Sequence, residues 1–133
     1  MISFKYKCVF IAVPKTGTRA ISRFLRSTAR EDESTLYKGY RSHMRLGKII
    51  GKFPETEDWY KFSVVRNPWD RLVSEYSYLL RVRPGLRKEK LTFREFLLEC
   101  KGHGKLYTNH IKPHVFFYNH RSPIDRFIRF ENL

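Results

Sequence analysis

Residues 10–19 read FIAVPKTGTR, and this stretch decides the fold. The residues before the turn, 4–13 (FKYKCVFIAV), are rich in aromatic and β-branched side chains, which is typical of a buried strand. The residues after it, 18–29, carry apolar side chains at helical spacing, so a helix is predicted to begin near Gly17. The stretch therefore predicts a strand, a tight turn and a helix.

The turn PKTGTR has the composition of an anion site. The amides at a helix start and the helix dipole favour an anion, and Gly17 permits close approach of the backbone. Thr16 and Thr18 offer hydroxyls, and Lys15 and Arg19 offer charge. A triphosphate loop of the form G-x-x-x-x-G-K-[ST] has its lysine after the last glycine, whereas this lysine precedes the glycine. The turn predicts a different phosphate-type site, and a helix cap with surface cations is the alternative.

A second strand, turn and helix follow later in the chain. Residues 59–65 (WYKFSVV) predict a buried strand, and Asn67 and Pro68 match a helix N-cap with proline at the first helical position. Arg66 ends the strand, and Ser74 lies about two helical turns further on. We expect Arg66 and Ser74 to bracket a second phosphate, unless Arg66 only satisfies a carboxylate.

The remaining segments complete the predicted architecture. Residues 92–100 predict a helix with a capping box between Thr92 and Glu95, and residues 126–130 predict a short strand. Two strand–turn–helix units indicate an α/β fold with a parallel sheet. In such sheets ligands bind at the carboxyl ends of the strands, which is where both turns lie.

The charge of the chain constrains its partners. The formal net charge is +14, from 27 Lys and Arg against 13 Asp and Glu, which implies an anionic partner. The apolar run at residues 8–13 is too short to cross a bilayer, so we expect a cytoplasmic chain without an export signal. We expect Cys8 and Cys100 to be buried free thiols.

The two turns together resemble the paired motifs of a known enzyme family. VPKTGTR and VRNPWDRLVSEY are similar to the signatures of sulfotransferases that use 3′-phosphoadenosine-5′-phosphosulfate (PAPS). The resemblance is strongest to the carbohydrate branch, whose pattern includes P-K-[TA]-G-[ST] and R-N-P-[YW]-[ED]-R-L-[VL]-S-x-Y. The segments YKFSVV and DRFIRFENL also resemble that branch, so the likeness extends over residues 9–133.

The resemblance implies a P-loop NTPase-like, three-layer α/β fold with a central parallel sheet. It implies one sulfotransferase domain over residues 1–133, incomplete at its C-terminal end because family members continue further. The expected reaction moves a sulfuryl group from PAPS, without a metal, to a hydroxyl acceptor on a carbohydrate. The expected compartment becomes the Golgi lumen if the chain belongs to a longer anchored protein.

The resemblance also assigns roles to individual residues. Lys15 would contact the bridging oxygen of the phosphosulfate. The rest of the loop would supply amides, hydroxyls and charge to the same group: Thr16, Gly17, Thr18 and Arg19. Arg66 and Ser74 would hold the 3′-phosphate of PAPS.

His43, in the segment RSHMRLG, is the candidate catalytic base. Family members commonly place a histidine between the two motifs, before a short helix. The ordinary pKa of histidine, about 6.5, suits proton transfer at neutral pH, and a surface or core histidine is the alternative. Arg41 and Arg45 beside it could bind an anionic acceptor or could simply be solvated.

Two other functions stay open from the sequence. The positive charge and the many aromatic residues permit a nucleic-acid or polyanion-binding module without catalysis. A kinase-like phosphotransferase is also compatible with the fold, but the absence of G-K-[ST] disfavours it. A polyanion-binding module does not explain why cations lie at two strand-to-helix turns.

Overall fold

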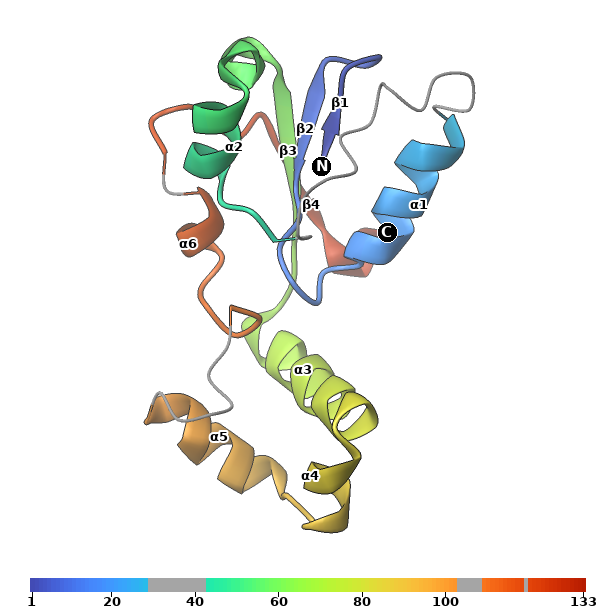
Figure 1. Ribbon diagram of the computed structural model, residues 1–133, viewed down its shortest axis with the longest axis vertical. Helices are drawn as coiled ribbons and strands as arrows, with labels where there is room; N and C mark the ends of the chain where they lie inside the picture. The colour runs from blue at the N-terminus through green and yellow to red at the C-terminus, as the bar shows by residue number, and fades with distance from the viewer. Residues whose placement is uncertain (29–42, 103–108, 119) are drawn as a thin grey trace. The chain divides into compact units, whose positions relative to one another are not determined.

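The computed structural model describes residues 1–28, 43–102, 109–118 and 120–133 (Figure 1). The chain divides into two compact units. The first contains Met1–Val65 and Pro113–Leu133, and the second contains Arg66–Lys112. Each unit is described by itself, and a single domain over the whole chain stays a prediction.

The first unit is built on a four-stranded sheet with strand order β1-β2-β3-β4. The strands are β1 (Ile2–Ser3), β2 (Cys8–Ile11), β3 (Tyr60–Val65) and β4 (Arg126–Arg129). β2, β3 and β4 are parallel, while β1 pairs with β2 in the antiparallel sense. The sheet is therefore mostly parallel, as predicted, with one antiparallel edge strand.

Successive side chains of β2 and the residues after it enter two different cores, because side chains alternate across a strand. Val9 and Ile11 face α2 (Leu46–Lys52) and α6 (Val115–Tyr118), and Phe10 faces α1 (Thr18–Thr28) on the other side. Figure 1 shows α1 on one side of the sheet and α2 with α6 on the other. This arrangement of helix, sheet and helix layers confirms the predicted three-layer α/β fold.

The predicted strand over residues 4–13 is wrong at its start. β2 begins only at Cys8, and a turn precedes it, in which the Lys7 N–H donates to the Phe4 carbonyl over 3.3 Å. Lys7 has a φ of 43°, in the left-handed region, so the extended backbone cannot pass through it. The alternation of aromatic and charged residues in FKYK is typical of a strand, but in the structure this segment forms the turn between β1 and β2.

The described residues of the second unit contain three helices: α3 (Pro68–Val82), α4 (Pro84–Lys88) and α5 (Phe93–Lys101). Its core is formed by Leu79 and Phe96 with partly buried apolar neighbours. The Asn67 side chain accepts from the Trp69 N–H over 2.9 Å, which confirms the predicted cap. The capping box of α5 is confirmed as well.

Pro84 follows the end of α3 and is the first residue of α4, where its missing N–H is tolerated. The 3₁₀ helix η2 (Pro54–Asp58) precedes β3, and the 3₁₀ helix η3 (Phe130–Asn132) follows β4.

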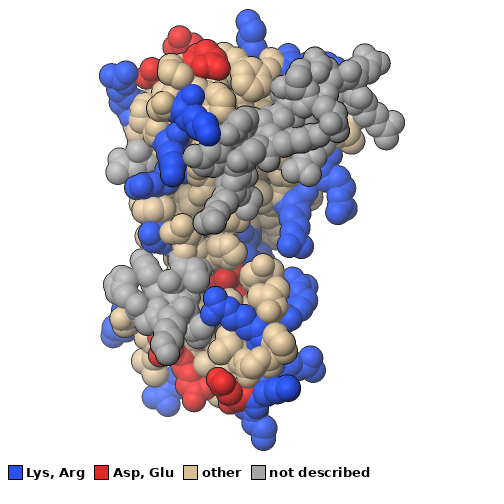
Figure 2. Space-filling view, viewed as in Figure 1, with Lys and Arg blue, Asp and Glu red and all other residues tan. Residues whose placement is uncertain are grey.

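Within the described ranges, no helix has the length and apolar character that a membrane span requires. Lys and Arg atoms are spread widely over the face in Figure 2, and Asp and Glu atoms gather in fewer places.

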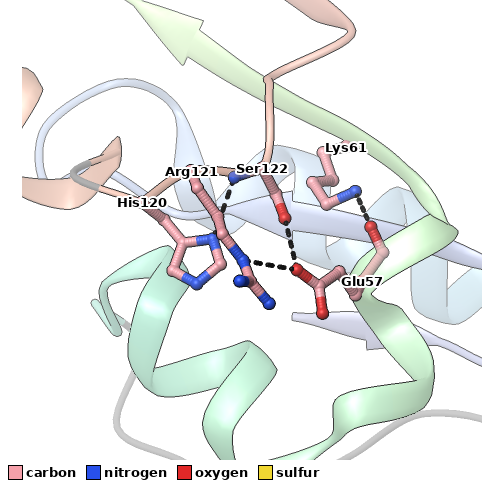
Figure 3. A network of polar contacts seen from close by, with 5 residues as sticks. All are labelled: Glu57, Lys61, His120, Arg121 and Ser122. Carbon is pink, nitrogen blue, oxygen red and sulfur yellow. Dashed lines mark hydrogen bonds and ion pairs between the residues drawn. The ribbon is translucent and has the colours of Figure 1, made fainter.

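A polar network holds the amino end of β3 (Figure 3). Glu57 Oε1 accepts from Arg121 Nε over 3.2 Å and from Ser122 Oγ over 3.3 Å. The buried Lys61 ammonium donates to the carbonyls of Glu57 and Trp59 over 2.5 and 2.9 Å. These contacts lie at the amino ends of the parallel strands. The candidate site is expected at the opposite edge of the sheet, where the carboxyl ends of the strands lie.

Candidate functional site

The PKTGTR loop is folded around one backbone carbonyl. The hydroxyls of Thr16 and Thr18 both donate to the Val13 oxygen, each over 2.8 Å. Thr16 is completely buried. Because each hydroxyl carries a single proton, both protons are used inside the loop. The loop therefore presents backbone N–H groups, rather than threonine O–H groups, as donors for an anion.

Two residues of the loop have left-handed backbones. Lys15 has a φ of 66° and Gly17 a φ of 72°. This conformation costs a residue with a side chain about 1–3 kcal/mol, and it occurs where surrounding contacts fix it. The hydrogen bonds of Thr16 and Thr18 to the Val13 carbonyl are such contacts, and they flank Gly17. The Lys15 side chain is half-buried, so it is not a fully solvated surface cation.

Gly17 is also required by its neighbours. A Cβ added to this residue would lie 3.3 Å from both the Phe130 ring and the Leu133 side chain. Phe130 belongs to η3, which directly follows β4. The segment RFENL, through Phe130 and Leu133, thus packs against the loop at Gly17.

The helix begins immediately after this glycine. The N–H groups of Ala20 and Ile21 donate to the Gly17 carbonyl over 2.9 and 3.3 Å. The N–H groups of Thr18 and Arg19 belong to the first turn of α1, where a helix has no carbonyl for them. The first turn contains no acidic residue. The start of α1 therefore has the donors and the charge that an anion requires.

His43 lies beside this loop. Its Nδ1 is 2.8 Å from the Ala12 carbonyl, which immediately precedes Val13 at the end of β2. A carbonyl oxygen can only accept, so Nδ1 carries the proton. In the neutral ring, Nε2 then has the lone pair that can take a proton from a substrate. Sequence reasoning proposed His43 from its place between two motifs, and the structure brings it to the first of them.

Arg66 and Ser74 belong to the second unit. Arg66 directly follows β3 in the chain and is half-buried, and Ser74 lies half-buried in α3. The structure therefore groups the predicted residues as the 15–19 loop with His43 in the first unit, and Arg66 with Ser74 in the second.

The burial of Glu75 in the second unit and its pairing with His110 were not predicted. Glu75 is 1% exposed, and its Oε2 lies 2.9 Å from His110 Nδ1. On the same face of α3, the buried Arg71 guanidinium donates to the Lys112 carbonyl. The sequence signal was the spacing of residues 71, 75 and 79, which places two charged residues on the buried face of a helix.

No group of three or more His, Cys, Asp or Glu side chains in the described segments is arranged to hold a metal ion.

A comparison with models of protein families identifies the family of the chain. The model described as "Sulfotransferase family" matches residues 1–131, so the chain belongs to the sulfotransferase family. Comparisons with curated proteins and with solved structures gave no match. Members of this family are transferases that move a sulfuryl group, and they generally use PAPS as the donor. The carbohydrate branch, to which the motifs are similar, is consistent with this family.

Proposed function

We propose that this protein transfers the sulfuryl group of PAPS to a hydroxyl of a carbohydrate, with His43 as the general base. The observation that carries the proposal is the 2.8 Å contact between His43 Nδ1 and the Ala12 carbonyl. It fixes the tautomer of the ring at the end of the strand that leads into the phosphate-type loop. The family assignment supplies the reaction class, and the loop supplies the anion site.

The 15–19 loop would bind the 5′-phosphosulfate. Its amides and the start of α1 favour an anion, and Lys15 and Arg19 add positive charge. His43 Nε2 takes the proton of the acceptor hydroxyl, whose oxygen forms a bond to sulfur. The bond between sulfur and the bridging oxygen breaks, and Lys15 stabilises the negative charge on the leaving phosphate. The products are a sulfate ester and 3′-phosphoadenosine-5′-phosphate (PAP).

The 3′-phosphate would be held by Arg66 and Ser74. Arg66 can donate two N–H groups to phosphate oxygens, and Ser74 can add a hydroxyl. Two separate cationic turns match a donor that carries phosphate groups at two positions. The carbohydrate nature of the acceptor is supported by the likeness of VRNPWDRLVSEY and DRFIRFENL to the carbohydrate branch.

Binding of PAP tests the cofactor part of this proposal. We expect PAP to raise the melting temperature of the wild type, and we expect Lys15→Ala and Arg66→Ala to abolish the shift. Lys88→Ala and Arg94→Ala are matched controls, because both residues are exposed on helices of the second unit and neither belongs to the two motif segments. A wild-type melting curve that PAP leaves unchanged would reject the proposal.

The transfer itself is measured with sulfur-labelled PAPS across a panel of glycans and phenols. Transfer to phenols alone would reject a carbohydrate acceptor. The formal charge of +14 keeps a polyanion-binding module as the second candidate. That function predicts salt-sensitive binding of single-stranded nucleic acid and no response to PAP.

A further inference from the structure

The chain bends between β2 and the PKTGTR loop through three successive carbonyl groups, and each of them accepts a hydrogen bond from a side chain. The Val13 carbonyl accepts from the two loop threonines, and the Ala12 carbonyl accepts from His43. The Ile11 carbonyl accepts from the Val13 N–H over 3.1 Å and from Ser63 Oγ over 2.7 Å. A bond between residues two apart closes a γ-turn, so the bend is centred on Ala12.

Ser63 is a polar residue in the middle of the sheet. It is completely buried in β3, opposite Ile11 in the pairing with β2, while Phe62 and Val64 on either side of it belong to the core that faces α1. A buried hydroxyl requires hydrogen-bond partners. Among the described residues, Ser63 has the Ile11 carbonyl and the Tyr118 hydroxyl, which is 3.0 Å away. Because the single Ser63 proton goes to Ile11, Tyr118 is the donor of the second bond.

The hydroxyl of Tyr118 is itself held in place. Tyr118 is the last residue of α6, and its ring lies 5.2 Å from the ring of Phe127 in β4, edge to face. Figure 1 shows α6 on the same side of the sheet as α2, the helix that His43 precedes. The bonds from Tyr118 to Ser63 and from Ser63 to Ile11 therefore connect α6 to the end of β2 on the side of the candidate base.

The direction of the Ala12 carbonyl determines which nitrogen of His43 can act as a base. With the Nδ1 proton donated to this carbonyl, Nε2 keeps its lone pair. The carbonyls of Ile11 and Ala12 belong to adjacent planar peptide units, so a bond that fixes one unit restricts the other. Without that restriction the ring can adopt its other tautomer, in which Nε2 carries the proton and cannot accept one.

We propose that Ser63 and Tyr118 are positioning residues for the candidate base, His43. Through the Ile11 carbonyl they fix the bend at Ala12, and the bend keeps the imidazole proton on Nδ1. Neither residue touches the reacting groups. For its catalytic consequence this inference rests on the proposed sulfotransfer function and deepens it, whereas the tautomer is a property of the protein without donor or acceptor.

The first experiment observes the tautomer directly in the variant Ser63→Ala combined with Tyr118→Phe. Because both partners become apolar groups of similar shape, this pair of changes costs little stability. Protein labelled with ¹⁵N-histidine is studied by NMR at about pH 8, where an ordinary histidine is neutral, and His43→Asn assigns the signal. We expect the Nδ1–H tautomer in the wild type and a mixture of tautomers in the double variant. Tyr118→Phe alone, which leaves the bond from Ser63 to Ile11, should give a smaller change in the same direction.

The second experiment measures the catalytic consequence with labelled PAPS and calorimetry with PAP. We expect kcat of the double variant to fall about 10- to 100-fold, because misplacement of a reacting group by about 1 Å has an effect of that order. PAP affinity should stay within a few-fold of wild type, since the threonine bonds inside the loop remain. A kcat that falls while PAP affinity holds is not what a general loss of stability produces.

Ser3→Ala combined with Thr56→Val is the matched control. It also removes two buried hydroxyls from the first unit, and Thr56 Oγ1 donates to the Phe53 carbonyl over 2.7 Å, as Ser63 does to Ile11. Thr56 belongs to η2, at the amino end of β3. We expect this control to keep the wild-type tautomer and kcat.

The outcomes distinguish this inference from the proposed function. A double variant that keeps the Nδ1–H tautomer overturns the inference, and so does a mixture of tautomers that appears equally in the control. A mixture with wild-type kcat overturns the catalytic role of the two residues. A wild type that neither responds to PAP nor transfers the sulfuryl group overturns the proposed function, while the NMR result still decides whether Ser63 and Tyr118 position His43.

Discussion

Gly17 and Phe130 are in contact, although more than a hundred residues separate them in the chain, and a Cβ on Gly17 would lie 3.3 Å from the Phe130 ring. The parallel pairing of β3 with β4 delivers η3 to the carboxyl edge of the sheet, and η3 then covers the glycine of the phosphate-type loop. The loop is thus held by the hydrogen bonds of its own threonines to Val13 and by packing against the Phe130 ring. Contacts between residues far apart in the sequence therefore stabilise the loop that we propose as the PAPS site.

Gly17→Ala is expected to damage both stability and PAP binding. The φ of 72° is unfavourable for alanine, and the new methyl group would crowd Phe130. We expect a loss of about 1–3 kcal/mol in the free energy of unfolding, measured by urea denaturation, and a weaker thermal shift with PAP. Gly51→Ala is the control, because a Cβ there meets nothing within 4 Å. This control should be neutral or slightly stabilising, since Gly51 lies in α2.

Phe130→Ala tests whether η3 positions the loop. We expect PAP affinity to fall because the ring no longer supports Gly17, and Phe130→Leu should recover part of it. Ile128→Ala removes a partly buried side chain of the same cluster, two residues earlier in β4, and no Ile128 atom is among the three nearest to a Cβ on Gly17. If calorimetry finds the same PAP affinity loss in both alanine variants, general destabilisation explains the effect and η3 has no positioning role.

His43→Asn separates catalysis from structure. The asparagine amide can still donate to the Ala12 carbonyl, but it has no group that takes a proton at neutral pH. We expect PAP affinity to stay within a few-fold of wild type while kcat falls about 100- to 10,000-fold, the usual contribution of a general base. Turnover from labelled PAPS and calorimetry with PAP measure the two quantities. Near-normal kcat would show that another group, or solvent, takes the proton.

Local patterns predicted much of the fold. The caps at Asn67 and Thr92 depend on residues within one helical turn, and both were found where the sequence placed them. The strands β3 and β4 were predicted from short segments of the sequence. A parallel sheet was predicted from the two strand–turn–helix units, which contain β2 and β3. The loop with one glycine was predicted as an anion site from its residue types, and its shape is compatible with that role.

Long-range contacts were not predictable in the same way. The pairing of His43 with Ala12 spans 31 residues, and that of His110 with Glu75 spans 35. Both depend on how the elements pack, which no local pattern encodes. The use of the threonine hydroxyls within the loop was also missed, because residue type alone does not say whether a hydroxyl faces a ligand or the backbone.

The network around Glu57 predicts a pH dependence of stability. The hydrogen bond from Arg121 and the charge of the same guanidinium are the main causes that lower the pKa of Glu57 below its ordinary value, and Ser122 and His120 add to the effect. A carboxyl group with a lowered folded-state pKa stabilises the protein above its unfolded pKa, and this stabilisation is lost as pH falls through the folded pKa.

Glu57→Gln should therefore lower the urea midpoint at about pH 7, and its effect should shrink towards about pH 2 as the folded-state carboxyl group becomes protonated. Glu55→Gln in the same 3₁₀ helix is the control. Among the described residues, Glu55 has no hydrogen bond or ion pair, so its substitution should leave both midpoints close to wild type. An equal loss for Glu57→Gln at both pH values would exclude ionisation as the source of the stabilisation.

The Glu75–His110 pair predicts a stability effect that a double-mutant cycle can isolate. Glu75 is buried, so His110→Ala leaves a carboxylate without its imidazole partner, at an expected cost of about 1–3 kcal/mol in unfolding free energy. Glu75→Leu combined with His110→Ala should be more stable than His110→Ala alone, because the buried charge is also removed. Urea unfolding of the wild type, both single variants and the double variant gives the interaction free energy. A double variant that is less stable than His110→Ala would mean that the Glu75 carboxylate stabilises α3 through other contacts. The pairing with His110 would then not be what compensates the burial of Glu75.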